Sequence, residues 1–240
     1  LLSANPQIEN PERLQIGQTV IIPQAPQRLG TIDVNGYVFP NVSSDVLQST
    51  LPHLTYLSIF SYQVRADGSL KTIDDADIIQ TARNAGVAPI MVITNIEEGA
   101  SFSSELASTI LGDLAVQNTL IANITTVLKE KNYFGLDVDF EYLYPEDRQN
   151  YNNFISRVVN ALRPQGYTVT VALAPKIGAG QQGLLYEAHD YASIGALVDH
   201  VILMTYEWGY TFGPAMAVSP IGEVRRVLNY ATSVIPSEKI

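Results

Sequence analysis

The sequence predicts an α/β protein whose centre is a parallel β-sheet. Short apolar segments of strand character recur at intervals of roughly 30 residues, with helix-forming segments or long loops between them. Strands that alternate with helices favour parallel pairing, because a crossover helix returns the chain to the same end of the sheet. With 46% apolar residues, the 240-residue chain can build one large domain around a hydrophobic core.

Six segments are expected to be strands: 32–39, 54–64, 88–95, 135–142, 168–174 and 200–208. The clearest helix follows Pro145-Glu146-Asp147, a proline and two acids of the kind that suit a helix start. Its apolar residues recur at three- and four-residue steps: Tyr151, Phe154, Ile155, Val158, Val159 and Leu162.

This pattern alone leaves two architectures open, an eight-stranded barrel and an open doubly wound sheet. A closed barrel of eight strands needs more chain than is present here. If the fold is a barrel, we therefore expect it to be cut short after the sixth strand-helix unit.

The N-terminal segment differs in composition from the rest. Residues 1–23 are expected to form a small unit that ends in a strand over 19–23. Residues 24–31 are expected to be a linker, because the segment from Pro23 to Thr31 holds two prolines, a glycine and polar residues. The predicted sheet domain then covers residues 32–240.

Charge and composition exclude several classes of partner. The net charge of −10 disfavours nucleic acid and anionic membranes, but it leaves a neutral glycan possible as a partner. The absence of cysteine excludes disulfides, thiolate catalysis and cysteine-based zinc sites. No apolar run approaches the roughly 18–20 residues of a membrane span, and the first residues lack the pattern of a signal peptide.

The segment Gly135-Leu-Asp-Val-Asp-Phe-Glu-Tyr142 carries the strongest indication of chemistry. Side chains alternate between the faces of a strand, so Asp137, Asp139 and Glu141 are predicted to share one face. Neighbouring acids would repel by roughly 2–3 kcal/mol at an effective dielectric of about 20. We therefore expect at least one of them to keep its proton at neutral pH, as a general acid must. Glu141 lies nearest the carboxyl end of the strand, where parallel barrels place their chemistry.

Other interpretations of the acids remain open. They could face water on an edge strand, or they could bind Mg²⁺ or Ca²⁺, although the glycine and regular oxygen ladder of an EF-hand loop are missing. The segment Gly178–Gly183 fits G-x-G-x-x-G, but no clean helix begins on its last glycine, so we expect a loop over the groove instead of a nucleotide site. The histidines at 53, 189 and 200 are scattered and are expected to be core or surface residues.

The acidic strand resembles the signature of the family 18 glycoside hydrolases, D-x-x-D-x-D-x-E, on the fourth strand of a (β/α)8 TIM-type barrel. Asp137, Asp139 and Glu141 match its last three acids, and Phe134 replaces the first. A second family element, M-x-Y followed by an acid, is similar to the segment Met204–Trp208. The serine and two glycines of the third family motif are not evident.

Longer stretches are similar to one subgroup, the spore cortex-lytic hydrolases of spore-forming bacteria: DFEYLYPEDR, YTVTVALAPK and LMTYEWGY with AVSPIG. Members of that subgroup carry LysM modules, which bind glycans containing N-acetylglucosamine. Residues 1–23 resemble the C-terminal half of a LysM repeat. The resemblance implies a peptidoglycan partner and an extracellular or spore-associated location, and it leaves the oligomeric state open.

The resemblance also implies a mechanism that needs no metal or cofactor, in which the substrate's own N-acetyl oxygen is the nucleophile. Glu141 would protonate the departing oxygen and later deprotonate water. Asp139 would stabilise the charge that develops on the acetamido group, and Asp137 would share a proton or hydrogen bond with Asp139. Tyr206 would orient the acetyl oxygen. The expected result is hydrolysis with retention of configuration.

Four further residues are expected to contact substrate: Asn95, Met204, Glu207 and Trp208. For Trp208, plain barrel packing is an equal alternative to stacking on a sugar ring. For Asn95, a role in loop structure is nearly as well supported as a place in the pocket.

The main hypothesis is thus an N-acetylglucosaminidase that acts on peptidoglycan of the spore cortex or its fragments. One alternative is a chitinase or endo-N-acetylglucosaminidase with the same catalytic residues. The other is a glycan-binding protein that does not cut; such proteins usually lose the terminal glutamate of the signature, which is present here as Glu141.

Overall fold

A computed structural model describes residues 2–8, 10–22, 30–209 and 213–240. The contacts divide the chain into two compact units, Leu1–Ile32 and Asp33–Ile240. Among the described residues, no helix is both long and apolar enough to cross a membrane.

The first unit holds one short helix, η1 (Leu2–Ala4), among its described residues. The buried amide of Asn5 donates to the Ile21 carbonyl and accepts from the Ile21 N–H, both at 2.7 Å. The predicted strand over 19–23 is wrong for residues 19–22, because a side chain, not a neighbouring strand, bonds the Ile21 backbone. Residue 23 and most of the predicted linker over 24–31 lie outside the described residues.

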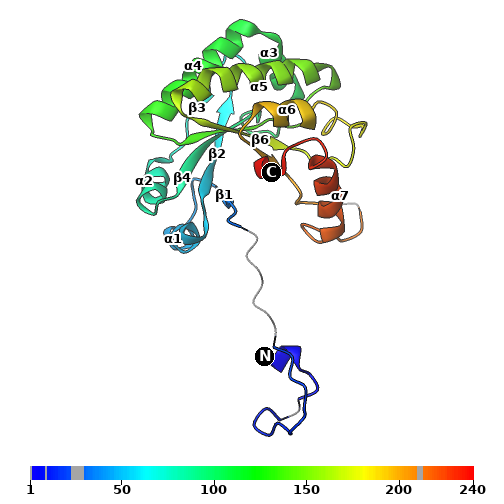
Figure 1. The fold of residues 1–240 in the computed structure, drawn as a ribbon. Helices are drawn as coiled ribbons and strands as arrows, with labels where there is room; N and C mark the ends of the chain where they lie inside the picture. Colours follow the sequence, from blue (N-terminus) through cyan, green and yellow to red (C-terminus); the bar gives the residue numbers. More distant parts are fainter. Residues whose placement is uncertain (1, 9, 23–29, 210–212) are drawn as a thin grey trace. The chain divides into compact units, whose positions relative to one another are not determined.

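The second unit is built on one sheet, whose strands can be followed in Figure 1. Six strands run parallel in the order β1-β2-β4-β5-β6-β7, and the short β3 pairs antiparallel with β2. Their bounds are β1 Asn35–Val38, β2 Tyr56–Val64, β3 Leu70–Lys71, β4 Ala88–Thr94, β5 Gly135–Asp139, β6 Thr168–Leu173 and β7 His200–Leu203.

This strand order decides between the two architectures left open by the sequence. Each parallel strand lies beside the one that precedes it in the chain, and the order never reverses. A doubly wound sheet requires such a reversal, whereas a (β/α) barrel advances in one direction. The second unit is therefore a partial (β/α) barrel.

The helices lie along the outer side of the curved sheet (Figure 1). Their bounds are α1 Ser44–Thr50, η2 Leu51–His53, α2 Ala76–Asn84, α3 Ser104–Gly112, α4 Leu114–Glu130, η3 Pro145–Asp147, α5 Arg148–Leu162, η4 Arg163–Gln165, α6 Tyr191–Leu197, α7 Ile221–Ala231 and η5 Ser237–Lys239. The helix predicted after residue 147 is confirmed as α5, and its six predicted apolar residues are all buried.

Alternation along β5 sorts its side chains as predicted. Leu136, Val138 and Phe140 are fully buried in the hydrophobic core, where the Phe140 ring stacks on Tyr151 and Phe154 of α5. The aspartates alternate with them and therefore face the inside of the partial barrel.

Two predicted strands end earlier than expected. The segment predicted over 135–142 is a strand only to Asp139, and that predicted over 200–208 only to Leu203. Beyond these points no neighbouring strand in the described part of the chain continues the ladder, and the backbone turns sharply: φ is +54° at Tyr142 and +58° at Glu207. The loops that follow carry most of the predicted site residues: Glu141, Met204, Tyr206, Glu207 and Trp208.

A buried carboxylate, that of Asp75 just before α2, stabilises the contact between β2 and the segment before β5. Asp75 accepts hydrogen bonds from the hydroxyls of Tyr62 (2.5 Å) and Tyr133 (2.6 Å) and forms an ion pair with Lys131 at 2.5 Å. All its partners come from distant parts of the chain, so the carboxylate joins β2 to the loop before β5.

Replacing Asp75 with alanine is expected to lower the free energy of unfolding by about 3–5 kcal/mol, because it leaves two buried hydroxyls and an ammonium group without their acceptor. Urea denaturation checks this. Its neighbour Asp74 is exposed, and Asp74→Ala is the matched control, expected within about 0.5 kcal/mol of wild type. Equal stability of the two variants would contradict the assignment.

Candidate active site

A groove lies at the carboxyl edge of the sheet, where β1, β2, β5, β6 and β7 end. Its volume is about 600 Å³, within the range of roughly 300–1,000 Å³ that is typical of ligand sites. The residues that line it are mainly aromatic, with three carboxylates: Tyr37, Phe39, Phe60, Phe102, Asp139, Glu141, Tyr142, Pro175, Leu185, Tyr186, Met204, Tyr206, Glu207 and Trp208.

Six of the eight predicted site residues line this groove together: Asp139, Glu141, Met204, Tyr206, Glu207 and Trp208. They come from two segments more than sixty positions apart in the sequence, which the barrel brings to one edge. The two remaining predicted residues, Asp137 and Asn95, are fully buried beside the groove.

Asp137 lies deepest of the acids. Its Oδ2 accepts a hydrogen bond of 2.5 Å from the Tyr37 hydroxyl, while its Oδ1 has no partner among the described residues. Burial raises the pKa of Asp137 to about 6, against the opposing effect of the Tyr37 hydrogen bond. No hydrogen bond joins Asp137 to Asp139 among the described residues: Tyr37 bonds Oδ2 of Asp137, and Oδ1 of each aspartate has no partner.

Asp139 lies one step nearer the groove and is 5% exposed. Burial raises its pKa well above the ordinary value, and the charges of Asp137 and Glu141 raise it further. Its Oδ1 is buried and has no partner among the described residues. An unpartnered buried carboxylate oxygen in a groove is a ready acceptor for an N–H group of a ligand.

Glu141 is half-buried at the wall of the groove. Burial raises its pKa to about 7, and the charge of Glu207 across the groove adds to the effect. At neutral pH its carboxyl group therefore holds a proton for much of the time, as a general acid requires. The sequence-based expectation that the crowded acids keep a proton agrees with these directions.

Asn95 does not lie where we predicted a substrate contact. Its amide donates to the Glu141 carbonyl and accepts from the Glu141 N–H, both at 2.9 Å, and it also donates to the Ser103 carbonyl at 3.0 Å. All its hydrogen-bonding groups are thus used within the protein. Asn95 holds the backbone of Glu141 and is absent from the groove lining.

The segment after β7 supplies the opposite wall. Tyr206 is partly exposed, and burial raises the pKa of its hydroxyl with help from the charges of Asp139, Asp137 and Glu141, so it remains a phenol and a hydrogen-bond donor at neutral pH. Trp208 packs against the core and also lines the groove, which combines the two alternatives considered for it.

The sequence analysis missed the aromatic residues that come from β1 and β2. Tyr37 and Phe39 lie at the end of β1 and Phe60 lies in the middle of β2, and the rings of Phe39 and Phe60 meet edge to face at 5.5 Å. Alternation along the predicted first strand places Tyr37 and Phe39 on one face, and this pattern could have indicated them. Of the three, Tyr37 is hydrogen-bonded to an acid, Asp137, from a strand that is not its neighbour in the sheet.

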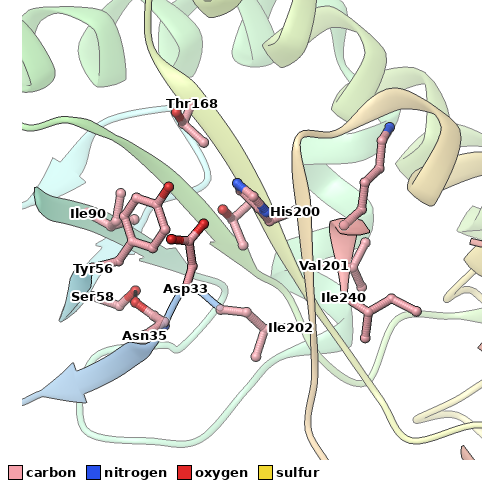
Figure 2. A pocket seen from close by; sticks show the side chains of 12 residues that line it. Asp33, Asn35, Tyr56, Ser58, Ile90, Thr168, His200, Val201, Ile202 and Ile240 are labelled. Carbon is pink, nitrogen blue, oxygen red and sulfur yellow. Dashed lines mark hydrogen bonds between the residues drawn. The ribbon is translucent and has the colours of Figure 1, made fainter. Parts of the chain in front are cut away.

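A second cavity of about 110 Å³ lies at the opposite, amino ends of the strands (Figure 2). Tyr56, Asp33 and His200 lie around it, and it holds none of the predicted site residues. The chemistry is therefore assigned to the larger groove. Among the described residues, no group of three or more acidic or histidine side chains is placed to hold a metal ion.

Comparison with known families agrees with this arrangement. The sequence model of the family described as Glycosyl hydrolases family 18 matches residues 33–236, which is nearly all of the second unit. The chain belongs to glycosyl hydrolase family 18.

Curated relatives of this family 18 chain include two proteins described as cortical fragment-lytic enzymes. That of Bacillus anthracis is 45% identical over 79% of this chain and 44% of its own length. That of Bacillus subtilis (strain 168) is 42% identical over 91% of this chain and 51% of its own length. The chain thus spans about half the length of the curated relatives it matches.

Solved structures give the same picture of the family 18 fold. The Bacillus cereus spore cortex-lytic enzyme SleL superposes with a TM-score of 0.84 at 39% identity, covering 95% of this chain and 53% of that one. A chitinase from Chromobacterium violaceum ATCC 12472 superposes with a TM-score of 0.79 at 19% identity, covering 87% of this chain and 67% of that one, and it supports the fold alone.

Proposed function

We propose that the protein hydrolyses N-acetylglucosaminyl linkages in bacterial peptidoglycan, with spore cortex fragments as the substrate. The observation that carries the proposal is the position of Glu141, whose carboxyl group lies in the groove with a pKa raised to about 7. The similarity to enzymes described as acting on cortical fragments supports the choice of substrate.

The proposed reaction begins with an N-acetylated sugar bound beside Glu141. The Glu141 carboxyl group donates its proton to the glycosidic oxygen as the bond from that oxygen to the sugar's anomeric carbon breaks. The carbonyl oxygen of the same sugar's N-acetyl group attacks that carbon and forms a cyclic oxazolinium ion. Water then attacks the anomeric carbon from the side of the departed group, and Glu141 takes up a proton from that water. The bond between the anomeric carbon and the acetyl oxygen breaks, which restores the N-acetyl group and the original configuration.

The other acids and Tyr206 are assigned roles from their surroundings. The unpartnered Oδ1 of Asp139 can accept the acetamido N–H and stabilise its developing positive charge, and burial strengthens this interaction. The Tyr206 hydroxyl can donate to the acetyl oxygen and orient it for attack. Asp137, held by Tyr37, contributes charge behind Asp139 without touching substrate.

Two alternatives differ in substrate or in chemistry. A chitinase or endo-N-acetylglucosaminidase would use the same residues on another glycan. A binding protein would hold the glycan without cutting it, and the retained Glu141 argues against this alternative because only proton transfer needs that group.

The test is to incubate the protein with purified cortex fragments and, separately, with chitin oligomers, and to measure new reducing ends. We expect reducing ends from cortex fragments, with retention of configuration, at a higher rate than from chitin. Faster cleavage of chitin would favour the chitinase alternative, and tight binding with no new reducing ends would favour the binding protein.

We further propose that residues 1–23 are part of a LysM module and that the protein is associated with the spore. The described part of this unit offers a polar hollow lined by residues such as Asn10, Arg13 and Gln18, which suits a neutral glycan. Binding to insoluble chitin, measured with and without residues 1–31, tests this part of the proposal.

A further inference from the structure

Where β5 ends, the backbone of residues 140–142 loses its strand partners. The ladder to β6 stops at Val138, and the ladder to β4 stops at Asp139. Carbonyl groups in a buried region must still find hydrogen-bond donors, because an unpaired one costs roughly 1–3 kcal/mol. The question is which groups take the place of a neighbouring strand.

Three side chains do so, one for each successive carbonyl. His189 Nε2 lies 3.0 Å from the Phe140 carbonyl oxygen, and Asn95 Nδ2 lies 2.9 Å from that of Glu141. The Ser104 hydroxyl donates to the carbonyl of Tyr142. We call Asn95, Ser104 and His189 the carbonyl clamp. Its members come from the end of β4, the first turn of α3 and the loop before α6.

The hydrogen bonds of His189 fix its protonation state. Its Nδ1 lies 2.8 Å from the Ala174 amide nitrogen and accepts that N–H, so Nδ1 carries no proton. The hydrogen is therefore on Nε2, which donates it to the Phe140 carbonyl. Complete burial lowers the pKa of His189 to about 4, which keeps the ring neutral at the pH where it holds the loop.

The clamp acts on a backbone that would otherwise be free to relax. Tyr142 adopts φ +54°, an uncommon conformation for a residue with a side chain. Asn95 bonds Glu141 on both its N–H and its carbonyl, so this residue is held from two directions. The Glu141 side chain projects from the middle of the held segment into the groove.

We propose that the carbonyl clamp consists of positioning residues, which fix Glu141 at the wall of the groove for proton transfer. The proposal rests on the proposed function, since positioning has meaning only for a residue that acts on substrate. A purely structural clamp would affect the stability of the loop alone. A positioning clamp also sets kcat and the pKa of Glu141.

The exposed end of the clamp gives a variant that is expected to fold. Ser104 is only half-buried, and Ser104→Ala removes its one hydrogen bond to the loop. The matched control is Thr109→Ala in the same helix, whose hydroxyl bonds only the carbonyl of Glu105 within α3. We expect kcat of the full-length protein on cortex fragments to fall about 10-fold in Ser104→Ala, with KM changed less than about 2-fold.

The His189 ring makes two hydrogen bonds, to the Ala174 N–H and to the Phe140 carbonyl, and two substitutions can each keep one of them. Gln in its place can reach the Phe140 carbonyl with its amide N–H, whereas the shorter Asn keeps an acceptor near the Ala174 N–H. We expect His189→Asn to lower kcat by about 10- to 100-fold and His189→Gln to lower it less, because only Gln still holds the loop.

The pH profile distinguishes positioning from stability. The general acid must be protonated, so activity falls as pH rises through the pKa of Glu141, about 7. In a loosened loop Glu141 reaches water, its pKa falls towards the ordinary value, and the alkaline limb of the profile moves to lower pH. This shift is expected for Ser104→Ala and His189→Asn and not for Thr109→Ala.

The outcomes are separable. An inactive wild type overturns the proposed function and this inference with it. An active wild type with unchanged kcat and an unchanged alkaline limb in Ser104→Ala overturns the inference and leaves the proposed function standing. If the His189 variants do not fold, Ser104→Ala and its control Thr109→Ala still test whether the clamp positions Glu141.

Discussion

Replacing Glu141 with Gln is expected to lower kcat on cortex fragments by about 10³-fold or more while the fragments still bind. Gln has nearly the same shape as Glu but carries no proton that can be transferred, and general acid catalysis contributes typically 10²–10⁴-fold. The aromatic lining of the groove is untouched, so binding energy is retained. Reducing-end assays give kcat, and calorimetric titration of the variant with fragments gives the affinity.

The matched control is Glu146→Gln, an exposed glutamate in η3 a few residues along the chain, for which wild-type activity is expected. Near-normal turnover in Glu141→Gln would remove this residue from the role of proton donor. Loss of binding as well as turnover would mean that Glu141 contributes to substrate affinity and not only to proton transfer.

The second large effect is expected at Asp139. In Asp139→Asn the side chain can still accept a hydrogen bond from an acetamido N–H, but it cannot become negatively charged as the cation forms. We therefore expect kcat to fall by about 10²–10³-fold with little change in KM, the split expected for an interaction made mainly in the transition state. Steady-state kinetics on the same fragments measure both constants.

Asp33→Asn serves as the control, because Asp33 lies at the amino ends of the strands beside the smaller cavity (Figure 2). It is expected to behave as wild type. A rise in KM without a fall in kcat at Asp139→Asn would show that Asp139 only binds the substrate, and the charge-stabilising role would have to be abandoned.

The sequence was informative wherever local periodicity determines structure. Alternation placed Asp137 and Asp139 opposite Leu136 and Val138, and steps of three and four residues marked the buried face of α5. The approximate location of all six parallel strands also followed from apolar segments, because each strand must be covered by helices on its outer face.

The sequence was less informative where one segment depends on another. The ends of β5 and β7 are set by where neighbouring strands stop, so Glu141 and Tyr206 lie in loops and not in the strands predicted for them. Tyr37 reaches Asp137 across one hundred positions of sequence. Asn95 was placed at the right strand end, but only the fold shows that its amide is used on the Glu141 backbone.

The central claim is that burial and neighbouring charge keep a proton on Glu141 at neutral pH. The most direct measurement is the pH titration of its side-chain carboxyl carbon by NMR, with Glu141→Gln identifying the resonance. The account predicts a midpoint of about 7. A midpoint near the ordinary value of 4.5 would mean that Glu141 is ionised at neutral pH and would contradict it.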